Sequence, residues 1–259
     1  MLRRTSFLGL ILALVLMLLP STVLAAKPGG GGSTTWTYTA LGDSLGTGFG
    51  ALQGYVPRYQ SYMATDTGNS VNLTNLSVNG WTSTDLLGAI RTDSSMRRSV
   101  KGSQVVTWDI GGNDLRGARS SYKSGTCGGA DNQDCLRAAV ATFQANWNAI
   151  VQEIKTLRAG ASTIYRTIDV YNPYVNEDKA DGSFTVMAPY LAQINDQIHA
   201  QASTYGYQYG KVWDAFNGPN HDTDPADKGW IFIDGLHPND TGHKVIADLL
   251  RGLGYAPLR

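Results

Sequence analysis

The 259-residue chain has few cysteines, no excess of charge of either sign and no long apolar run, and each of these absences argues against a class of protein. Lysine plus arginine number 21 and aspartate plus glutamate also number 21, so nothing indicates a nucleic-acid or anionic-membrane partner. The apolar run at residues 7–19 is shorter than the roughly 20 residues that a membrane-spanning helix needs. Two cysteines cannot by themselves close a zinc site. No internal repeat is present.

The first residues have the order of a secretory signal. Arg3 and Arg4 precede the apolar run, and small residues ending at Ala25 and Ala26 follow it. We therefore expect a signal peptide at 1–25, a flexible glycine-rich leader at 26–35, and one domain at 36–259. A retained membrane anchor is the alternative, and the short run argues against it. The mature protein is expected to be secreted, without a stable membrane anchor.

The two cysteines, Cys127 and Cys135, lie close together in a chain that is expected to be exported. Export favours a disulfide between them over a metal-binding pair. Two free buried thiols are the alternative.

Short runs rich in β-branched and aromatic residues alternate with helical patterns. The predicted strands cover residues 36–41, 71–76, 104–110, 163–168 and 207–213. The predicted helices cover residues 56–64, 84–91, 134–157, 186–204 and 241–250. Strands separated by helices predict a mainly parallel α/β sheet covered on both faces. The polar stretch 115–133 is expected to form a rim or lid. In such folds reactive groups gather at the carboxyl ends of the strands.

The first predicted strand runs directly into Gly42-Asp43-Ser44-Leu45-Gly46, which places a hydroxyl on a glycine-rich turn at a strand end. A serine hydroxyl is a weak nucleophile at neutral pH, so it needs a neighbouring base and a third group that orients the base. Taken alone, Ser44 is also an ordinary turn residue.

The base and its orienting acid are found near the other end of the chain. Asp234 and His237 stand three residues apart before the last predicted helix, and Pro238 disfavours helical geometry at the histidine. Asp234 is therefore close enough to accept the Nδ1 proton of His237, which leaves Nε2 to take a proton from Ser44.

Acyl transfer also needs donors for the oxyanion that forms on the carbonyl oxygen. Two candidates follow the second and third predicted strands. Gly80 offers an unobstructed backbone N–H, and Asn113, in Gly111-Gly112-Asn113-Asp114, offers a side-chain amide. The backbone N–H of Ser44 is the third candidate donor.

With these four blocks in order, the chain resembles the SGNH or GDSL hydrolases. The resemblance covers residues 38–248, and Gly80 is its least specific match. It implies a three-layer α/β/α sandwich with a five-stranded, flavodoxin-like sheet. It implies Ser44, His237 and Asp234 as catalytic residues, and Ser44, Gly80 and Asn113 as oxyanion donors. It also implies that no metal or organic cofactor is required.

Two other motifs compete for the same glycines. The segment at 42–46 fits the G-x-S-x-G elbow of α/β-hydrolases, but only one predicted strand precedes it and no His-Gly-Gly loop lies upstream. The segment at 46–51 fits a dinucleotide fingerprint, which suits an exported protein poorly.

We therefore expect a secreted serine esterase that acts on short- to medium-chain acyl esters. A carbohydrate acetylesterase of the same family is the first alternative, and a non-catalytic carbohydrate-binding or adhesive module is the second. Trp81, Trp230 and Phe232 are candidates for lining the acyl pocket or for core packing. The acidic loop at 220–227 is read as a solvated loop, with calcium binding as the alternative.

Overall fold

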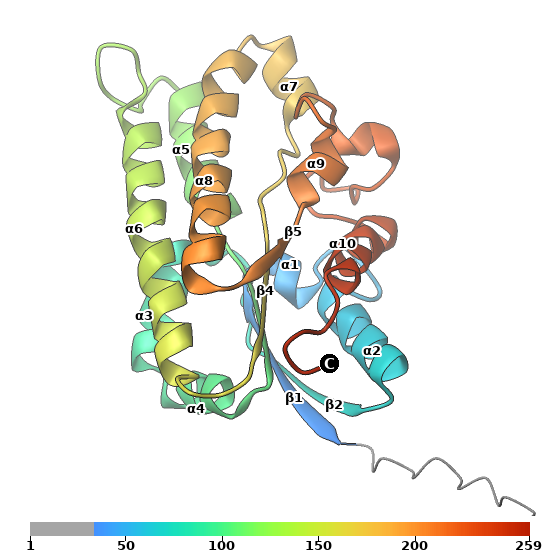
Figure 1. Ribbon diagram of the computed structural model, residues 1–259. Helices are drawn as coiled ribbons and strands as arrows, with labels where there is room; N and C mark the ends of the chain where they lie inside the picture. Colours follow the sequence, from blue (N-terminus) through green and yellow to red (C-terminus); the bar gives the residue numbers. More distant parts are fainter. Residues whose placement is uncertain (1–33) are drawn as a thin grey trace, which may run out of the picture. The chain divides into compact units, whose positions relative to one another are not determined.

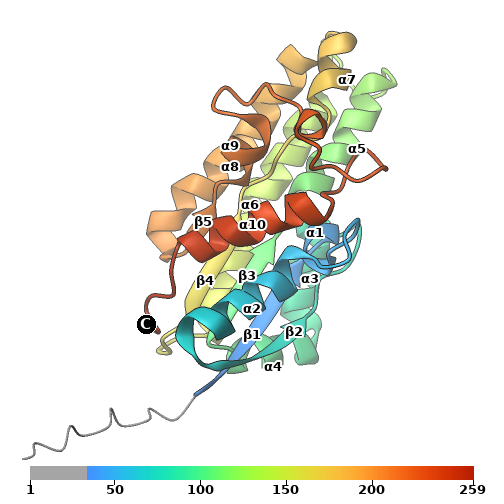
Figure 2. The same cartoon turned by 90° about the vertical axis from the view of Figure 1, so that its right-hand side faces the viewer.

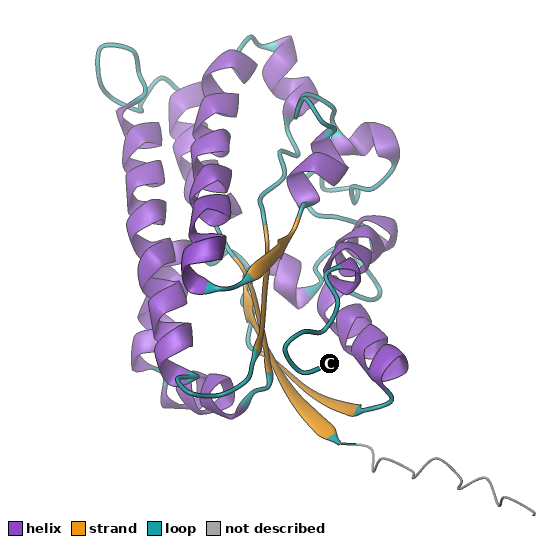
Figure 3. Ribbon diagram, in the orientation of Figure 1, coloured by secondary structure: helices purple, strands orange, loops and turns teal. Residues whose placement is uncertain are grey.

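Five strands form one sheet in the order β2-β1-β3-β4-β5, and every neighbouring pair is parallel. The computed structural model describes residues 34–259, so the expected signal peptide and most of the leader lie outside the described residues. The strands are β1 (Thr35–Gly42), β2 (Ser70–Asn75), β3 (Val105–Asp109), β4 (Ile164–Ile168) and β5 (Gln208–Gly210). Parallel strands need crossover connections, and Figure 3 shows helices in these connections.

Helices cover both faces of the sheet (Figure 1). One face carries α3 (Ser83–Thr92), α4 (Ser94–Gly102), α5 (Gly112–Lys123), α6 (Asp134–Leu157) and α8 (Phe184–Tyr205). The other face carries α1 (Ser44–Thr47), α2 (Tyr55–Thr67), α9 (Val212–Asn217) and α10 (Asp240–Gly252). Two short elements, α7 (Val175–Ala180) and the 3-10 helix η1 (Pro225–Lys228), lie in the connections. The predicted three-layer α/β/α fold is therefore confirmed.

The core is split by the sheet into two layers. Val106 and Trp108 of β3 pack against the layer that includes α6 and α8, whereas Val105 packs against the layer that includes α2 and α10. Both faces of a parallel sheet are covered, which explains why β3 is apolar at successive positions. The same strand ends in Asp109, a buried carboxyl group at the edge where β1 also ends.

Four of the predicted strands are confirmed with small shifts at their ends, and Thr35, expected in the leader, already belongs to β1. The fifth prediction, at 207–213, is wrong in its second half. Only Gln208–Gly210 is a strand, and Val212 begins α9. The buried carboxylate of Asp169 accepts the backbone N–H of Trp213 over 2.7 Å, so this segment turns into a helix after a short edge strand.

The five predicted helices are also confirmed, and α6 has the predicted bounds. The stretch 115–133, expected to form a rim or lid, begins within α5 (Gly112–Lys123) and continues as a loop. A disulfide joins Cys127 in this loop to Cys135 at the start of α6, as expected. Within residues 34–259, no helix combines the length and apolarity needed to cross a bilayer.

Candidate active site

Ser44 is the first residue of α1 and lies at the carboxyl end of β1, an interior strand. The preceding Asp43 caps this helix, since its carboxylate accepts the backbone N–H of Leu45 over 2.9 Å. Gly42 has a φ of +149°, and a Cβ at this position would overlap the carboxyl group of Asp109. Only glycine therefore allows the strand to turn here and to present the Ser44 hydroxyl.

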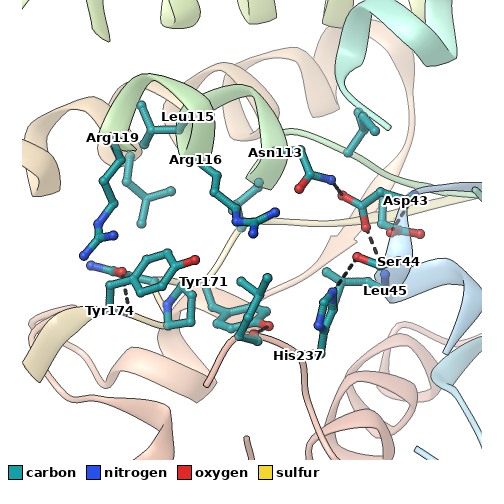
Figure 4. A pocket seen from close by; sticks show the side chains of 18 of the residues that line it. Asp43, Ser44, Leu45, Asn113, Leu115, Arg116, Arg119, Tyr171, Tyr174 and His237 are labelled. Carbon is teal, nitrogen blue, oxygen red and sulfur yellow. Dashed lines mark hydrogen bonds between the residues drawn. The ribbon is translucent and has the colours of Figure 1, made fainter. Parts of the chain in front are cut away.

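The three residues predicted for nucleophilic catalysis form one hydrogen-bonded chain (Figure 4). His237 Nε2 lies 2.8 Å from Ser44 Oγ, and His237 Nδ1 lies 2.6 Å from Asp234 Oδ2. The other carboxylate oxygen of Asp234 accepts the backbone N–H groups of Leu236 and His237, each over 3.0 Å. The acid is thereby fixed on the loop that carries the histidine, and the imidazole is aimed at the serine.

Asp234 stays ionised because of the same hydrogen bonds. Partial burial acts to raise the pKa of this carboxyl, but the donors from the His237 side chain and the two backbone N–H groups outweigh it and lower the pKa. An ionised Asp234 can stabilise the imidazolium that forms when His237 takes up a proton.

Asn113 lies in the first turn of α5 and lines the same cavity as Ser44 and His237. Its side-chain nitrogen donates to the carbonyl oxygen of Trp81 over 2.9 Å and to Asp43 Oδ2 over 3.3 Å. The structure thus brings the predicted amide donor to the predicted nucleophile. The long bond to Asp43 is the one that an oxyanion would have to displace.

Gly80 lies in the turn after β2 with a φ of +81° and with no heavy atom within 4 Å of the position a Cβ would take. Its neighbour Trp81 provides the carbonyl that accepts the Asn113 amide, so this turn lies beside the cavity. Among the described residues that line the cavity, Gly80 is not included. Its role as an oxyanion donor remains a prediction.

Two buried carboxyl groups lie beneath the nucleophile, and the sequence motifs predict a catalytic role for neither. Burial is the main cause that raises the pKa of Asp43, to about 6. Burial, followed by the charge of Asp43, holds the pKa of Asp109 well above its usual range. Two adjacent buried carboxyls cannot both ionise without a large cost, so the pair takes up a proton more readily than isolated carboxyls do.

Asp109 anchors the turn that holds Ser44. Its Oδ2 accepts the backbone N–H of Gly46 over 3.1 Å, and its Oδ1 accepts the hydroxyl of Tyr55 over 2.6 Å. A carboxyl residue at the end of a strand whose only other polar residue is Thr107 is the sequence signal that could have identified this residue. A similar anchor is Asp114, whose Oδ2 accepts the backbone N–H of Ser83 over 2.9 Å.

His243 lies in the first turn of α10, and its imidazole does not face solvent. The side chain is fully buried under the loop between α1 and α2. Its Nδ1 accepts the backbone N–H of Tyr55 over 3.3 Å, and its Nε2 lies 3.2 Å from the carbonyl oxygen of Phe49. Burial lowers the pKa of His243 to about 4, so the ring is neutral at pH 7.

Each of the other two histidines lies beside a carboxylate. His199 is on α8 and lies 3.0 Å from Asp169, and His221 lies 2.7 Å from Asp214 in the polar loop. The carboxylates of that loop are used as caps and contacts. Asp224 accepts the backbone N–H groups of Ala226 and Asn176, over 2.8 and 2.9 Å. Within residues 34–259 these carboxylates do not converge on a common point, and calcium binding stays without support.

A cavity of about 860 Å³, its open mouth included, extends from Ser44 between α5, α8 and the segment after β4. Its apolar wall is formed by Leu115, Ile168, Val170, Met187 and Leu191. Arg119, whose guanidinium lies 2.6 Å from the Asp178 carboxylate, lies among the lining residues away from the serine (Figure 4). The candidate aromatics Trp81, Trp230 and Phe232 are not part of this lining among the described residues.

The comparisons with known proteins agree with this arrangement. The model of the GDSL-like lipase/acylhydrolase family matches residues 40–245. The spore germination lipase LipC of Bacillus licheniformis is 26% identical over 230 residues, which cover 86% of this chain and 99% of that protein.

Solved structures show the same fold. A lipase from a goat rumen metagenome superposes with a TM-score of 0.69 at 24% identity, over 86% of this chain and 100% of that one. An acetyl xylan esterase from Geobacillus stearothermophilus superposes with a TM-score of 0.58 at 19% identity, over 88% and 98%. The family match covers most of the chain, including the serine, asparagine and histidine blocks described above, and on that ground this protein is a member of the GDSL-like lipase/acylhydrolase family of hydrolases.

Proposed function

We propose that this hydrolase is a serine esterase that cleaves carboxylic acyl esters through an acyl-enzyme on Ser44. The observation that carries the proposal is the chain of two hydrogen bonds from Ser44 Oγ to His237 Nε2 over 2.8 Å, and from His237 Nδ1 to Asp234 over 2.6 Å. This is the geometry that removes a proton from a serine hydroxyl and stabilises the resulting imidazolium.

In the first half of the reaction, Ser44 Oγ bonds to the ester carbonyl carbon while its proton passes to His237 Nε2. Negative charge then develops on the carbonyl oxygen, where the Asn113 amide and the backbone N–H groups of Ser44 and Gly80 would donate to it. Collapse of this intermediate breaks the ester C–O bond. The leaving alcohol takes the proton from His237, and the acyl group remains on Ser44.

In the second half, water replaces the alcohol. The water oxygen bonds to the acyl carbon while His237 accepts a proton from the water. His237 then gives that proton to Ser44 Oγ as the bond from Ser44 to the acyl carbon breaks and the acid leaves. Asp234 holds the same imidazole tautomer through both halves. The residues that bind and move protons thus return to their starting states.

Short- to medium-chain acyl esters are the proposed substrates. The cavity beside Ser44 has an apolar wall that includes Leu115, Met187 and Leu191, and this wall suits an acyl chain longer than acetate. Removal of acetyl groups from carbohydrates is the second candidate, and the charged pair Arg119 and Asp178 in the lining favours it, because sugar hydroxyls need polar partners. An acetyl xylan esterase is among the structural neighbours.

Initial rates on p-nitrophenyl esters of increasing chain length, together with acetate release from acetylated xylan, test this proposal. A kcat/KM that rises from acetate to butyrate or hexanoate, with little acetate released from xylan, supports the acyl esterase. The reverse order supports the carbohydrate acetylesterase. No turnover of any ester would support the binding module instead.

Export of the mature protein is also part of the proposal. The charged, apolar and small-residue order of the first 26 residues supports it, and so does the disulfide between Cys127 and Cys135, which persists in oxidising compartments. Cell fractionation, with the mature N-terminus determined by mass spectrometry, tests this part.

A further inference from the structure

Five large apolar side chains of residues 34–259 are exposed to solvent, and all five lie on loops around Ser44 and His237. Leu52 is 99% exposed and Ile233 is 93% exposed, and the other three are Phe49, Val78 and Phe232. Isolated exposed apolar residues are normal on a protein surface. Their concentration on one rim, with the remainder of the described surface free of them, is not explained by chance scatter.

The loops at 48–54 and 229–239 are in direct contact with the candidate active site. The ring of Phe49 lies 4.6 Å from the imidazole of His237, between centroids. A Cβ at Gly50 would lie 3.2 Å from the Cβ atoms of both Phe232 and His237. The loop at 48–54 and the loop at 229–239 are therefore neighbours, and both border the proposed base.

A third loop, at 76–82, contacts the residues on either side of Ser44. The backbone N–H of Val78 donates to the carbonyl of Gly42 over 3.0 Å, and Asn79 accepts the Thr47 hydroxyl over 2.6 Å. Figure 2 shows the loop before α10, in red, on the same edge of the molecule as the blue loop beside α1. We call the five exposed side chains on these three loops the apolar rim.

The apolar rim carries almost no charge. Loops 48–54 and 76–82 contain no charged residue, and loop 229–239 contains only Asp234, whose carboxylate is bonded to His237. The charged groups that flank these loops have partners. Asp240 accepts the backbone N–H of Leu52 and pairs with Arg58 over 2.9 Å, and Lys228 donates to the carbonyl oxygen of Ala215 over 2.6 Å. A surface whose flanking cations already have partners offers little to anionic headgroups, and its exposed apolar side chains are free to leave water.

We propose that the apolar rim docks the enzyme on an uncharged lipid surface, so that its esters are drawn from an aggregated or membrane phase. The inference rests on the proposed esterase activity and adds the physical state of the substrate. The position of the rim favours lipid over a second copy of the chain, because a protein partner seated there would cover the nucleophile. A lipid surface instead brings the ester to it.

The test compares the wild-type protein with Leu52→Ser/Ile233→Ser. This double variant changes the two most exposed apolar side chains and leaves Ser44 and His237 in place. Binding to phosphatidylcholine vesicles is measured by co-sedimentation in a Ser44→Ala background, so that no lipid is consumed. Loss of two inserted aliphatic side chains should weaken vesicle binding about tenfold or more. The binding of the parent should change little between about 0.05 and 0.5 M salt.

The kinetic readout uses the active forms of both proteins. The rate on a p-nitrophenyl ester carried in phosphatidylcholine vesicles should fall about tenfold in the double variant, while kcat/KM for dissolved p-nitrophenyl acetate stays within about twofold. The matched control is Gln152→Ser/Thr156→Ser on the exposed side of α6, near the opposite edge of the sheet, and it should change neither rate.

Three results would overturn the proposal. One is a parent protein that does not bind neutral vesicles, or binds only anionic ones in a salt-sensitive way. Another is equal vesicle binding by the parent and the double variant. The third is a dimer in size-exclusion chromatography that the double substitution dissociates, since the rim would then join two copies. Failure to hydrolyse dissolved esters would contradict the proposed function, whereas the vesicle-binding arm would still report on docking.

Discussion

The side-chain amide of Asn113 donates a hydrogen bond to the carboxylate of Asp43 over 3.3 Å. The group proposed to bind the oxyanion is therefore held in place by the residue directly before the nucleophile. A second, shorter bond to the Trp81 carbonyl fixes the plane of the amide. The donor is set in position before substrate arrives, and only the longer bond to Asp43 has to be given up when charge develops on the carbonyl oxygen.

Replacement of Asn113 by alanine should lower kcat by about 100- to 1,000-fold, because a donor to the developing oxyanion is lost while substrate binding is largely kept. Steady-state kinetics on p-nitrophenyl butyrate would show this as a fall in kcat with KM nearly unchanged. Asn176→Ala removes a comparable amide, which donates to Asp227 over 3.0 Å outside the cavity, and should leave kcat as it is. A fall in both variants would point to damage to the fold.

Ser44→Ala and His237→Ala should each reduce kcat/KM to near background, and Asp234→Asn should reduce it less, because the serine and the base remain in place. Circular dichroism should show the three variants folded. His221→Ala is the matched control, since it breaks a histidine–aspartate pair of 2.7 Å in a surface loop. Turnover that survives the loss of His237 would argue against this histidine as the base.

The buried imidazole of His243 should make stability depend on pH. Its pKa is about 4 in the folded protein against 6.5 without burial, so the unfolded chain binds more protons between these values. Stability from this group is complete above pH 6.5 and is lost as pH falls towards 4, by up to about 1.4 kcal/mol per pH unit.

Urea unfolding of the wild type and of His243→Asn between pH 7 and 4 isolates this contribution. The variant should be less stable by about 1–3 kcal/mol at pH 7, because two buried hydrogen bonds are weakened, and the gap should narrow with falling pH. The raised pKa of Asp43 acts in the opposite direction, since the folded state gains a proton below about pH 6. That contribution is common to both proteins and cancels in the difference. A gap that is constant over this range would contradict the account.

Reduction of the bond between Cys127 and Cys135 should lower heat tolerance more than activity. The bond closes a small ring from the loop after α5 to the start of α6, so its contribution is expected to be about 2–3 kcal/mol. The melting temperature should fall by roughly 5–10 °C, while kcat/KM at 25 °C is retained. Cys127→Ser/Cys135→Ser should reproduce the effect without a reductant. Equal losses of stability and activity would show that the ring also shapes the cavity.

The sequence predicted which residues of the candidate site lie together better than it predicted what surrounds them. Ser44, Asn113 and His237 each follow a strand or precede a helix in a motif whose local chemistry is specific, and parallel topology then brings strand ends together. By contrast, the importance of Asp109 depends on its contact with Asp43. The two residues lie far apart in the sequence, with the two crossover connections between β1 and β3 separating them. No local pattern reports such a contact.

The missed features share this dependence on distant parts of the chain. His243 has polar neighbours in the sequence, but it is buried because the loop at 48–54 folds over it. The helix α5 has only Leu115 and Ala118 as buried apolar residues, so its helical pattern is weak, and its place is set by packing against α6. Propensity and periodicity are overridden by tertiary contacts in cases of this kind.

The central claim is that Ser44 is an activated nucleophile and that His237 is the group that activates it. Reaction with a fluorophosphonate, followed by peptide mapping by mass spectrometry, tests this claim most directly. We expect one adduct, on Ser44, that disappears in Ser44→Ala and forms far more slowly in His237→Ala. An unlabelled wild-type protein, or an adduct on another serine that persists in Ser44→Ala, would contradict it.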